Sequence, residues 1–362
     1  MSDYMMATIG PADVPEAAEF IVRSATTLRR EDGFDAYLSG EDVSQMRQGL
    51  QSRLFENPFC RADIPPGLVL KNDQGAIVGT LMTYPWRYLL GERSLLGLAA
   101  SVFFVDPAAR MQGFFMFRRY LNTTGVDFWY ANTCNARSGA IWQKSGGIVV
   151  PESGIEYMVV FHVGPVAEEL ALRRGASKAV RRIYRIAGAL ARPLTWQRRS
   201  GLALARETDW QRMAVIADKD RDPAILTCHR SDAYLRWTYE SALKQGAVEI
   251  YRFEDTHGNA GWFSLNRARR GKANQIRGVK LLDVVWPRDR IDFRNVLRAI
   301  IEKARVNSDL LSIRPRPGMA LEPRRVAVIR RSLPAPEAFV LVRAKGGPDL
   351  SRIIDLAAAD AV

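Results

Sequence analysis

A basic turn that contains a glycine follows an apolar run in the first third of the chain. Residues 102–105 are apolar and predict a buried strand that ends before Pro107. The segment Arg110-Met111-Gln112-Gly113-Phe114-Phe115 then leads into a predicted helix, whose first amide groups lack intrahelical acceptors and carry partial positive charge. Such a turn can hold an anion, and Gly113 allows the backbone to approach it. The residue types therefore predict a phosphate-binding turn.

The helix predicted over residues 113–122 places its large apolar side chains on one face. Phe114, Phe117 and Leu121 make up this face, and two arginines lie on another. The aromatic residues 126–131 then predict a strand. We therefore expect the turn to be held between two buried strands.

The strand over 126–131 is followed by a second recognisable pattern. Asn135 comes shortly after it, and an aromatic-x-Lys-x-Gly run extends from Trp142 to Gly146. With Arg110 and Gly113, these residues resemble the acyl-CoA-binding core of the GCN5-related N-acetyltransferase (GNAT) superfamily, whose pyrophosphate loop reads Arg/Gln-x-x-Gly-x-Gly/Ala. Phe115 stands where that pattern has a small residue.

The predicted element order agrees with the same superfamily. It comprises a strand at 7–9, helices near 12–24 and 41–54, and strands near 67–71, 76–86 and 96–105. The resemblance implies acetyl-CoA or another acyl-CoA as co-substrate. The residues that it assigns to acyl-CoA binding are Phe104, Val105, Arg110, Met111, Gln112, Gly113, Phe114, Phe115 and Asn135.

The resemblance also implies a mechanism. The strand carrying residues 101–105 would splay from the one carrying 127–132, pantetheine would bond to the exposed backbone like an added strand, and an N–H near Phe104 would stabilise the oxyanion. Trp142 stands where many members have the tyrosine that protonates the leaving thiolate, and an indole is a poor acid. The catalytic acid and base stay unassigned.

Length and charge point to two domains of different character. The chain has 362 residues, of which 47% are hydrophobic and 25% charged, enough for two cores. Residues 1–164 hold 14 basic and 17 acidic side chains, whereas the remainder holds 38 and 22. Positive charge is therefore concentrated in the second half.

Part of this charge lies in a segment that we expect to be helical, residues 165–193. Seven basic residues alternate there with apolar ones: Arg173, Arg174, Lys178, Arg181, Arg182, Arg185 and Arg192. One interpretation is a linker helix that packs its apolar stripe on a domain and leaves its arginines in water. The other is peripheral attachment to anionic lipid or an acidic polymer.

Beyond this segment the element order repeats and resembles a second, degenerate GNAT-like half. Strands are predicted at 202–205, 248–253, 261–266, 279–286 and 310–313, and helices at 209–217 and 289–304. The turn here, Pro287-Arg288-Asp289-Arg290-Ile291-Asp292, lacks a glycine and holds two carboxylates at the expected helix start. Carboxylates would satisfy the helix dipole and repel a pyrophosphate, so we expect only the first half to bind acyl-CoA.

The predicted fold class is α/β, with two GNAT-like domains that each contain a central mixed, mostly antiparallel sheet flanked by helices. The predicted boundaries are 1–164 for the acyl-CoA-binding domain, 165–200 for a basic helical linker and 201–362 for the degenerate domain. The implied activity is acyl-CoA-dependent N-acylation of an amine or amino sugar. Residues 230–239 resemble a stretch of tandem GNAT-like proteins, some of them associated with cell-surface polysaccharide biosynthesis.

Two other functions remain open. A Fem-type ligase would use aminoacyl-tRNA, which the positive charge would suit, but the sequence shows no RNA-recognition signature and so disfavours a nucleic-acid partner. The other is a binding protein that keeps the fold without catalysis. Phe115 and Trp142 favour it because both depart from the pattern of the superfamily.

Metal and membrane classes are not expected. The three cysteines and three histidines are widely spaced, without a ligand pattern. No apolar run reaches the ~18 residues that span a bilayer, and the first residues lack the features of a signal peptide. The expected compartment is the cytoplasm.

Overall fold

The computed structural model describes residues 4–32, 43–190, 200–219, 221–271, 275–319, 321, 328–342 and 350–355. The chain divides into two compact units, each built from two stretches of sequence. The first unit comprises 1–150 and 337–352, and the second comprises 151–336 and 353–362. The first domain predicted from the sequence ends at residue 164, whereas the first unit ends at Val150 because the next strand pairs within the second unit.

The first unit contains a mixed, mostly antiparallel sheet. Its described strands follow the order β1-β2-β3-β4-β5-β15-β6, along which β4 and β5 are the parallel neighbours. The strands are β1 (Met5–Thr8), β2 (Gly67–Lys71), β3 (Ile77–Leu90), β4 (Arg93–Val105), β5 (Phe128–Ala131), β6 (Ile148–Val149) and β15 (Phe339–Val342).

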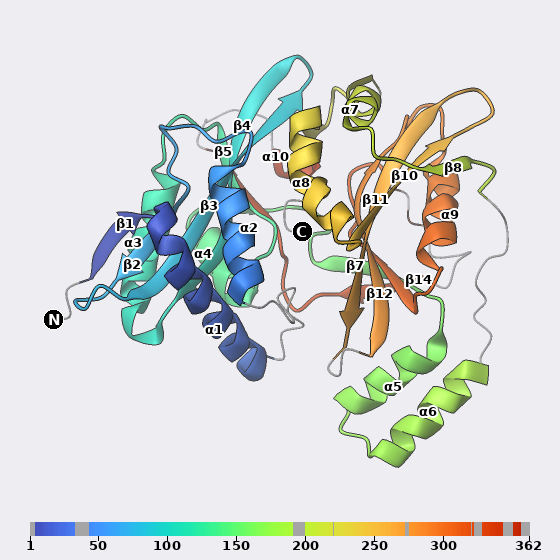
Figure 1. The fold of residues 1–362 in the computed structure, drawn as a ribbon, viewed down its shortest axis with the longest axis horizontal. Coiled ribbons are helices and arrows are strands. Elements are labelled where there is room, and N and C mark those ends of the chain that lie inside the picture. The colour runs from blue at the N-terminus through green and yellow to red at the C-terminus, as the bar shows by residue number, and fades with distance from the viewer. Residues whose placement is uncertain are drawn as a thin grey trace. The chain divides into compact units, whose positions relative to one another are not determined.

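Helices cover both faces of this sheet (Figure 1). The helices are α1 (Val14–Asp32), α2 (Val43–Phe55), α3 (Arg110–Leu121) and α4 (Ala136–Lys144). Side chains alternate between the faces of a strand, so Leu68 and Leu70 of β2 join Met116 and Phe117 of α3 in one core. The opposite face lies under α1 and α2, which contact β3.

The second unit contains a sheet of the same design, in the order β14-β7-β13-β12-β11-β10-β8, whose only parallel neighbours are β12 and β13. Its strands are β7 (Ile155–Val160), β8 (Ala203–Arg206), β10 (Val248–Glu254), β11 (Ala260–Arg270), β12 (Ile276–Val285), β13 (Leu310–Ile313) and β14 (Val328–Ser332). A short strand, β9 (Leu226–Cys228), pairs with β16 (Ile354–Asp355) next to the four-residue helix α10 (Leu350–Ile353). The predicted fold class, two mixed sheets flanked by helices, is confirmed.

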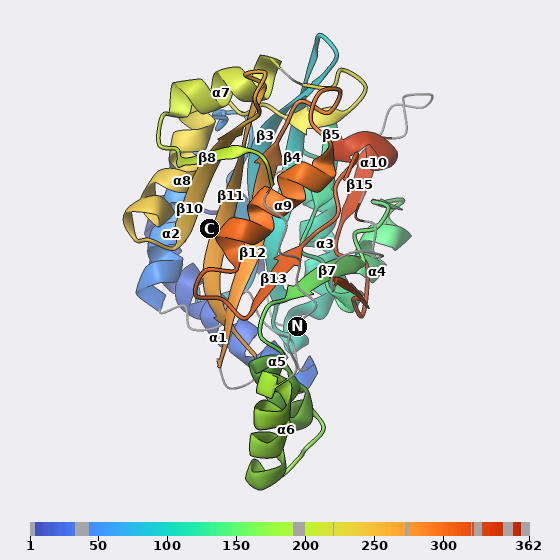
Figure 2. The ribbon, with the colours of Figure 1, turned by 90° about the vertical axis from the view of Figure 1, so that its right-hand side faces the viewer.

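Three helices pack on this second sheet. They are α7 (Trp210–Lys219), α8 (Asp232–Lys244) and α9 (Phe293–Ala304). Trp262 of β11 bonds through its indole N–H to the Met213 carbonyl oxygen of α7, whereas its neighbour Phe263 lies in the core beneath α9. The two faces of β11 are therefore covered by different helices (Figure 2).

The segment expected to form one helix over 165–193 forms two within its described part. Helix α5 (Val163–Arg173) and helix α6 (Lys178–Leu190) lie side by side and are joined through Gly175, whose φ of 75° ends helical geometry. A Cβ atom at Gly188 of α6 would lie 2.7 Å from the Cα atom of Gly164. The hairpin therefore depends on two glycines where the helices cross, and residues 191–193 lie outside the described residues.

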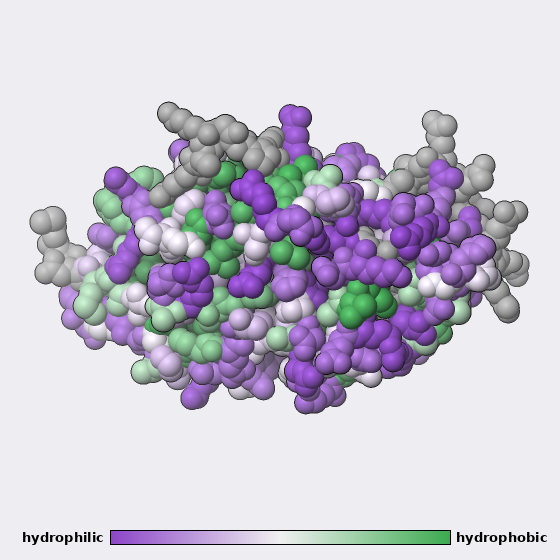
Figure 3. Space-filling model, turned by 90° about the horizontal axis from the view of Figure 1, so that it is seen from above, coloured by the Kyte–Doolittle hydropathy of each residue, from purple (hydrophilic) through white to green (hydrophobic). Residues whose placement is uncertain are grey.

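Large apolar side chains are exposed mainly on two short stretches of the described chain. One stretch is the start of α3, and the other is the α5–α6 hairpin. Figure 3 shows one face of the molecule, on which apolar residues lie in small groups among hydrophilic ones. None of the described helices is both long enough and apolar enough to cross a membrane.

Candidate functional site

Strands β4 and β5 of the first unit run together and then part. Their parallel pairs are Gly97 with Phe128, Leu98 with Trp129 and Ala99 with Tyr130, and no further pair joins these two fully described strands. Residues 101–105 of β4 keep only β3 as a ladder neighbour and are half-buried. The structure thus contains the splay that the resemblance implies, and we call it the β4–β5 fork.

A β-bulge lies on β4 just inside the fork. Between two ladder pairs with β3, one residue of β3 opposes two residues of β4, Val102 and Phe103. Val102 has a φ of 49°, a conformation that strains a β-branched residue, and its carbonyl oxygen accepts from Thr80 Oγ1 at 3.0 Å. The bulge disrupts the regular ladder immediately before Phe104, and the resemblance implies that an N–H near this residue stabilises the oxyanion.

Tyr120 of α3 closes the narrow end of the fork. Its hydroxyl oxygen lies 2.7 Å from the carbonyl oxygen of Leu98 and 3.3 Å from that of Tyr130, so it connects the two strands where they part. The indole N–H of Trp129 donates in turn to the Tyr120 carbonyl oxygen at 3.2 Å. Burial raises the pKa of Tyr120 well above its ordinary value, which keeps the hydroxyl protonated and able to donate.

The start of α3 follows β4 through a short 3-10 helix, Pro107–Ala109. No side chain caps α3, because its N-cap residue is Ala109. Arg110 is exposed in the first turn. This helix start therefore keeps its positive end available to an anion.

Gly113 serves a different purpose from the one that the sequence suggested. It is buried, and a Cβ atom there would lie 3.1 Å from Cγ2 of Val105, so the glycine lets α3 pack closely on β4. Phe114 and Phe115 are 52% and 48% exposed. Of the apolar face expected to hold Phe114, Phe117 and Leu121, Phe117 is buried and Phe114 is exposed, because the buried stripe of α3 runs through Gly113, Met116, Phe117 and Tyr120.

Asn135 begins α4. Its side-chain oxygen accepts the N–H groups of Arg137 and Ser138 at 3.0 and 2.9 Å, and the Ser138 hydroxyl oxygen accepts the N–H of Asn135. This capping box explains why an asparagine stands at this position. Asn135 therefore stabilises the start of α4, and its side-chain oxygen already accepts two backbone N–H groups there.

Trp142 of α4 belongs to the core of the first unit. It is 2% exposed, and its ring lies edge-on to Phe117 and stacked on Phe339. Gly146, with a φ of 87°, ends the helix beyond it. In the aromatic-x-Lys-x-Gly run, Trp142 is thus a buried core residue and Gly146 ends the helix.

Two strands of the second unit also part, but here a side chain lies between them. Strands β12 and β13 pair only from Gly278–Leu310 to Lys280–Ser312, and Leu282 of β12 is the extra residue of a bulge against β11. Arg316, three residues beyond β13, donates to the Leu282 carbonyl oxygen and reaches Asp283 Oδ1 at 2.5 Å. A side chain thus satisfies the bulged backbone, and we call this place the β12–β13 fork.

An ion network surrounds Arg316. Arg230 donates two hydrogen bonds to Asp283, at 2.8 and 2.9 Å, and Asp355 lies within 3.7 Å of both arginines. Asp283 is fully buried, and although burial alone would raise its pKa, Arg230 and Arg316 hold that pKa well below the ordinary value. The network therefore keeps a buried carboxylate charged inside the β12–β13 fork.

A side chain of the protein itself also caps the start of the helix that follows β12. Helix α9 begins at Phe293, later than the predicted residue 289, because Asp292 is its N-cap and accepts the N–H of Arg294 at 2.9 Å. Asp289 lies in the preceding turn, where its side chain is 73% exposed. Of the two carboxylates expected at this helix start, Asp292 caps the helix and Asp289 lies outside it.

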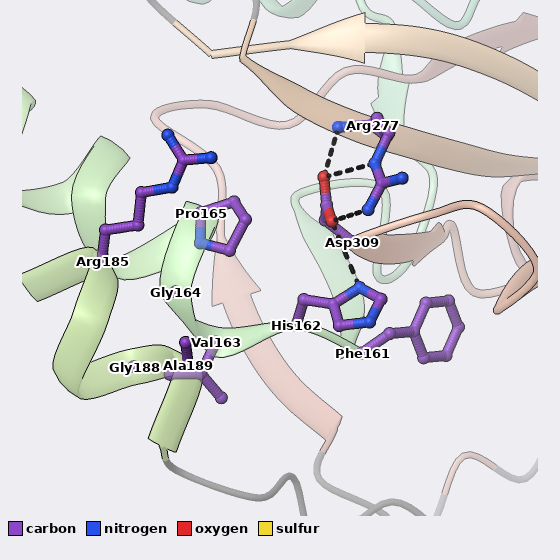
Figure 4. A pocket seen from close by; sticks show the side chains of 10 residues that line it. All are labelled: Phe161, His162, Val163, Gly164, Pro165, Arg185, Gly188, Ala189, Arg277 and Asp309. Atoms are coloured by element: carbon purple, nitrogen blue, oxygen red, sulfur yellow. Dashed lines mark hydrogen bonds and ion pairs between the residues drawn. The ribbon is translucent and has the colours of Figure 1, made fainter.

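A pocket of about 300 Å³ opens beside α5 within the second unit. Arg185 of α6 lies on one side, and the Arg277–Asp309 pair lies on the other (Figure 4). His162 Nδ1 is 3.2 Å from Asp309 Oδ1 and 2.9 Å from the carbonyl oxygen of Ser308. None of the residues predicted to bind acyl-CoA lines this pocket.

Three features of the two forks could not be predicted from the sequence. Nothing in an apolar run identifies Val102 as a bulge residue. Tyr120 was recognisable only as part of a helical stripe with Met116 and Phe117, and the pairing of Arg316 with Asp283 joins residues far apart in the chain. The residues assigned at 104–105 and 110–115 do lie together, on either side of one turn, whereas Asn135 starts a separate helix.

Solved structures share this architecture. The N-myristoyltransferase of Saccharomyces cerevisiae with bound myristoyl-CoA matches with a TM-score of 0.59 at 9% sequence identity, over 98% of this chain and 85% of that one. A probable N-acyltransferase from Enterococcus faecalis matches with a TM-score of 0.58 at 11% identity, over 94% and 73%. No protein-family model matches the sequence, and no curated protein does. The chain therefore shares the two-sheet α/β fold of these two solved structures.

Proposed function

We propose that this chain is an acyl-CoA-dependent N-acyltransferase that binds acyl-CoA in its first unit and acylates an amine or amino sugar. The observation that carries this proposal is the β4–β5 fork, which leaves one edge of β4 unpaired and leads directly into an uncapped helix start. A fold shared with an enzyme solved with myristoyl-CoA supports it. In the second unit Arg316 occupies the corresponding fork, and Asp292 caps the helix that follows it.

The first unit would hold acyl-CoA in two places. The unpaired edge of β4 at Phe104 and Val105 suits the amide groups of pantetheine, which can bond to it like a short strand. The exposed start of α3, with Arg110, Met111 and Gln112, suits the diphosphate. Exposed Phe114 and Phe115 lie beside that helix start and are accessible to the same ligand.

The proposed reaction is one acyl transfer. The neutral amine attacks the thioester carbonyl, a C–N bond forms, the C–S bond breaks, and the amine loses a proton as coenzyme A leaves as a thiolate. A backbone N–H near Phe104 would stabilise the oxyanion. Buried Trp142 does not supply the proton for the thiolate, so water or a group of the acceptor complex must do so.

We propose an acidic acceptor because positive charge is concentrated in residues 165–362, which hold 38 basic and 22 acidic side chains. Sugar nucleotides and uronic polymers have this character, which would suit a role in surface polysaccharide biosynthesis. The Fem-type ligase remains a prediction of the sequence alone. A catalytically silent acyl-CoA-binding protein is the second candidate, and the burial of Trp142 favours it.

Calorimetric titration with coenzyme A tests the binding step. We expect wild type to bind and Arg110→Glu to weaken binding at least tenfold, because a carboxylate would replace a cation at the start of α3. The matched control is Arg294→Glu, in the first turn of α9, which should leave the affinity unchanged. Equal weakening by both variants, or no binding by wild type, would contradict the proposal.

A thiol-release assay with acetyl-CoA and a panel of amines and amino sugars tests the chemical step. Release of free thiol that depends on the amine and is lost in Arg110→Glu would support the transferase. Binding of coenzyme A without turnover of any acceptor would instead support the catalytically silent protein.

A further inference from the structure

Helix α6 exposes an apolar stripe. Val180, Ile183, Tyr184 and Ile186 are 40%, 65%, 50% and 56% exposed. The first three recur at the i, i+3, i+4 spacing of one helical face, and Ile186 lies next to Ile183 on it. An exposed group of this size on one helix is unusual for a surface that faces only water.

The side of α6 that faces the rest of the second unit is the opposite one. Gly188 is buried against Gly164 of α5, and Arg181 is partly buried. Figure 4 shows Arg185, Gly188 and Ala189 along the pocket beside α5. The usual arrangement of a surface helix, apolar side inward and charged side outward, is therefore reversed. The interpretation in which the apolar stripe packs on a domain does not hold for the described residues.

Positive charge accompanies the stripe. Helix α6 contains Lys178, Arg181, Arg182 and Arg185 and no acidic residue. Arg185 lies 3.5 Å from Glu168 of α5, whereas Lys178 and Arg182 are exposed beside the stripe. An occupant of this surface has to accept apolar side chains and supply negative charge.

We propose that α6 binds flat in the interface of a membrane that contains anionic lipid. Such a surface receives Ile183 and Ile186 among its acyl chains and Tyr184 at the headgroup level, while anionic headgroups attract the flanking cations. A second copy of α6 fits less well. Pairing the two stripes would bring together two helices whose charged residues are all basic, and these charges repel one another. A nucleic acid would neutralise the arginines but leave the stripe in water.

Vesicle cosedimentation with the full chain tests this proposal. We expect binding to vesicles of phosphatidylcholine mixed with phosphatidylglycerol and much weaker binding to phosphatidylcholine alone. Ile183→Asp combined with Ile186→Asp should lower the partition coefficient at least tenfold. The control is Val215→Asp on α7, which is also 65% exposed, and it should change nothing. All three side chains are exposed, so the melting temperature should stay the same.

The charge contribution is tested separately. Lys178→Gln and Arg182→Gln should each lower partitioning into the anionic vesicles about fivefold, and added salt should have a similar effect. Equal binding by wild type and the double aspartate variant would overturn the proposal, and so would equal binding to both kinds of vesicle. A dimer that is lost in the double variant, without vesicle binding, would overturn it in favour of a second copy.

This test is independent of the acyltransferase proposal. The double aspartate variant changes no residue that we assign to acyl-CoA, so its affinity for coenzyme A should equal that of wild type. Loss of vesicle binding with retained coenzyme A binding would therefore concern α6 alone.

Discussion

The β4–β5 fork and the β12–β13 fork have the same pattern of strand pairing but differ in their side chains. In each unit a bulged central strand runs parallel to its neighbour for three pairs and then parts from it. The β12–β13 fork receives Arg316, which bonds to the bulged backbone and to Asp283. In the β4–β5 fork the bulged carbonyl oxygen of Val102 accepts from the short side chain of Thr80 on β3, and no buried ion pair is found there among the described residues. The two forks therefore differ in their side chains rather than in their backbone pairing.

The helix starts that follow the forks differ in the same sense. Helix α9 is capped by the carboxylate of Asp292, whereas α3 begins at Ala109 without a side-chain cap and presents Arg110. A carboxylate stabilises a helix start and repels a second anion. Asp292 therefore stabilises the start of α9 and disfavours an anion there. The two helix starts thus differ in one local feature, the presence of a carboxylate cap.

The largest expected effect concerns the network that fills the β12–β13 fork. Asp283→Asn should lower the free energy of unfolding by about 3–5 kcal/mol, because it leaves Arg230 and Arg316 buried without their carboxylate. Urea unfolding measures this. The control, Asp63→Asn, removes the charged partner of exposed Arg61 and should leave the free energy of unfolding nearly unchanged.

The same variant has a defined pH dependence. Because the pKa of folded Asp283 is depressed, its contribution to stability is present above the unfolded value of about 3.9 and declines as the pH falls below it. The stability difference between wild type and Asp283→Asn should therefore shrink below about pH 4. A difference that stays constant down to the acid transition would show that Asp283 is not charged in the fold.

An intermediate effect is expected at the narrow end of the β4–β5 fork. Tyr120→Phe removes the hydroxyl that connects the carbonyl oxygens of Leu98 and Tyr130, and should cost about 1–2 kcal/mol of unfolding free energy. Coenzyme A should also bind more weakly, since the strands lose the contact that fixes where they part. Exposed Tyr184→Phe is the control and should alter neither quantity.

The smallest effect tests the second helix start. Asp292→Ala should cost about 1 kcal/mol by removing the cap of α9, whereas Asp289→Ala, outside the helix, should have little effect. Calorimetry should find no new coenzyme A site in Asp292→Ala, because Arg316 still fills the fork. Coenzyme A binding gained in the second unit would mean that the cap alone excludes the ligand.

The sequence by itself determined features that depend on residues close together in the chain. Strand 310–313 is found at its predicted bounds, and the carboxylate before α9 caps it as expected, because a cap and its helix are neighbours in sequence. The helix break at Gly175 and the exposure of Phe114 also concern single residues within or next to a helix, yet the sequence did not predict them. A helical pattern alone does not show where a helix ends or which of its faces the neighbouring elements cover.

The tertiary structure decided everything that joins distant residues. Strand β7 pairs in the second sheet and β15 (Phe339–Val342) in the first, so neither unit is one continuous stretch of chain. Gly113 became a packing residue only once Val105 lay against it, and the β12–β13 fork was filled only when Arg316 met Asp283. These outcomes depend on steric fit and charge pairing across the fold, which the spacing of residues in a chain does not encode.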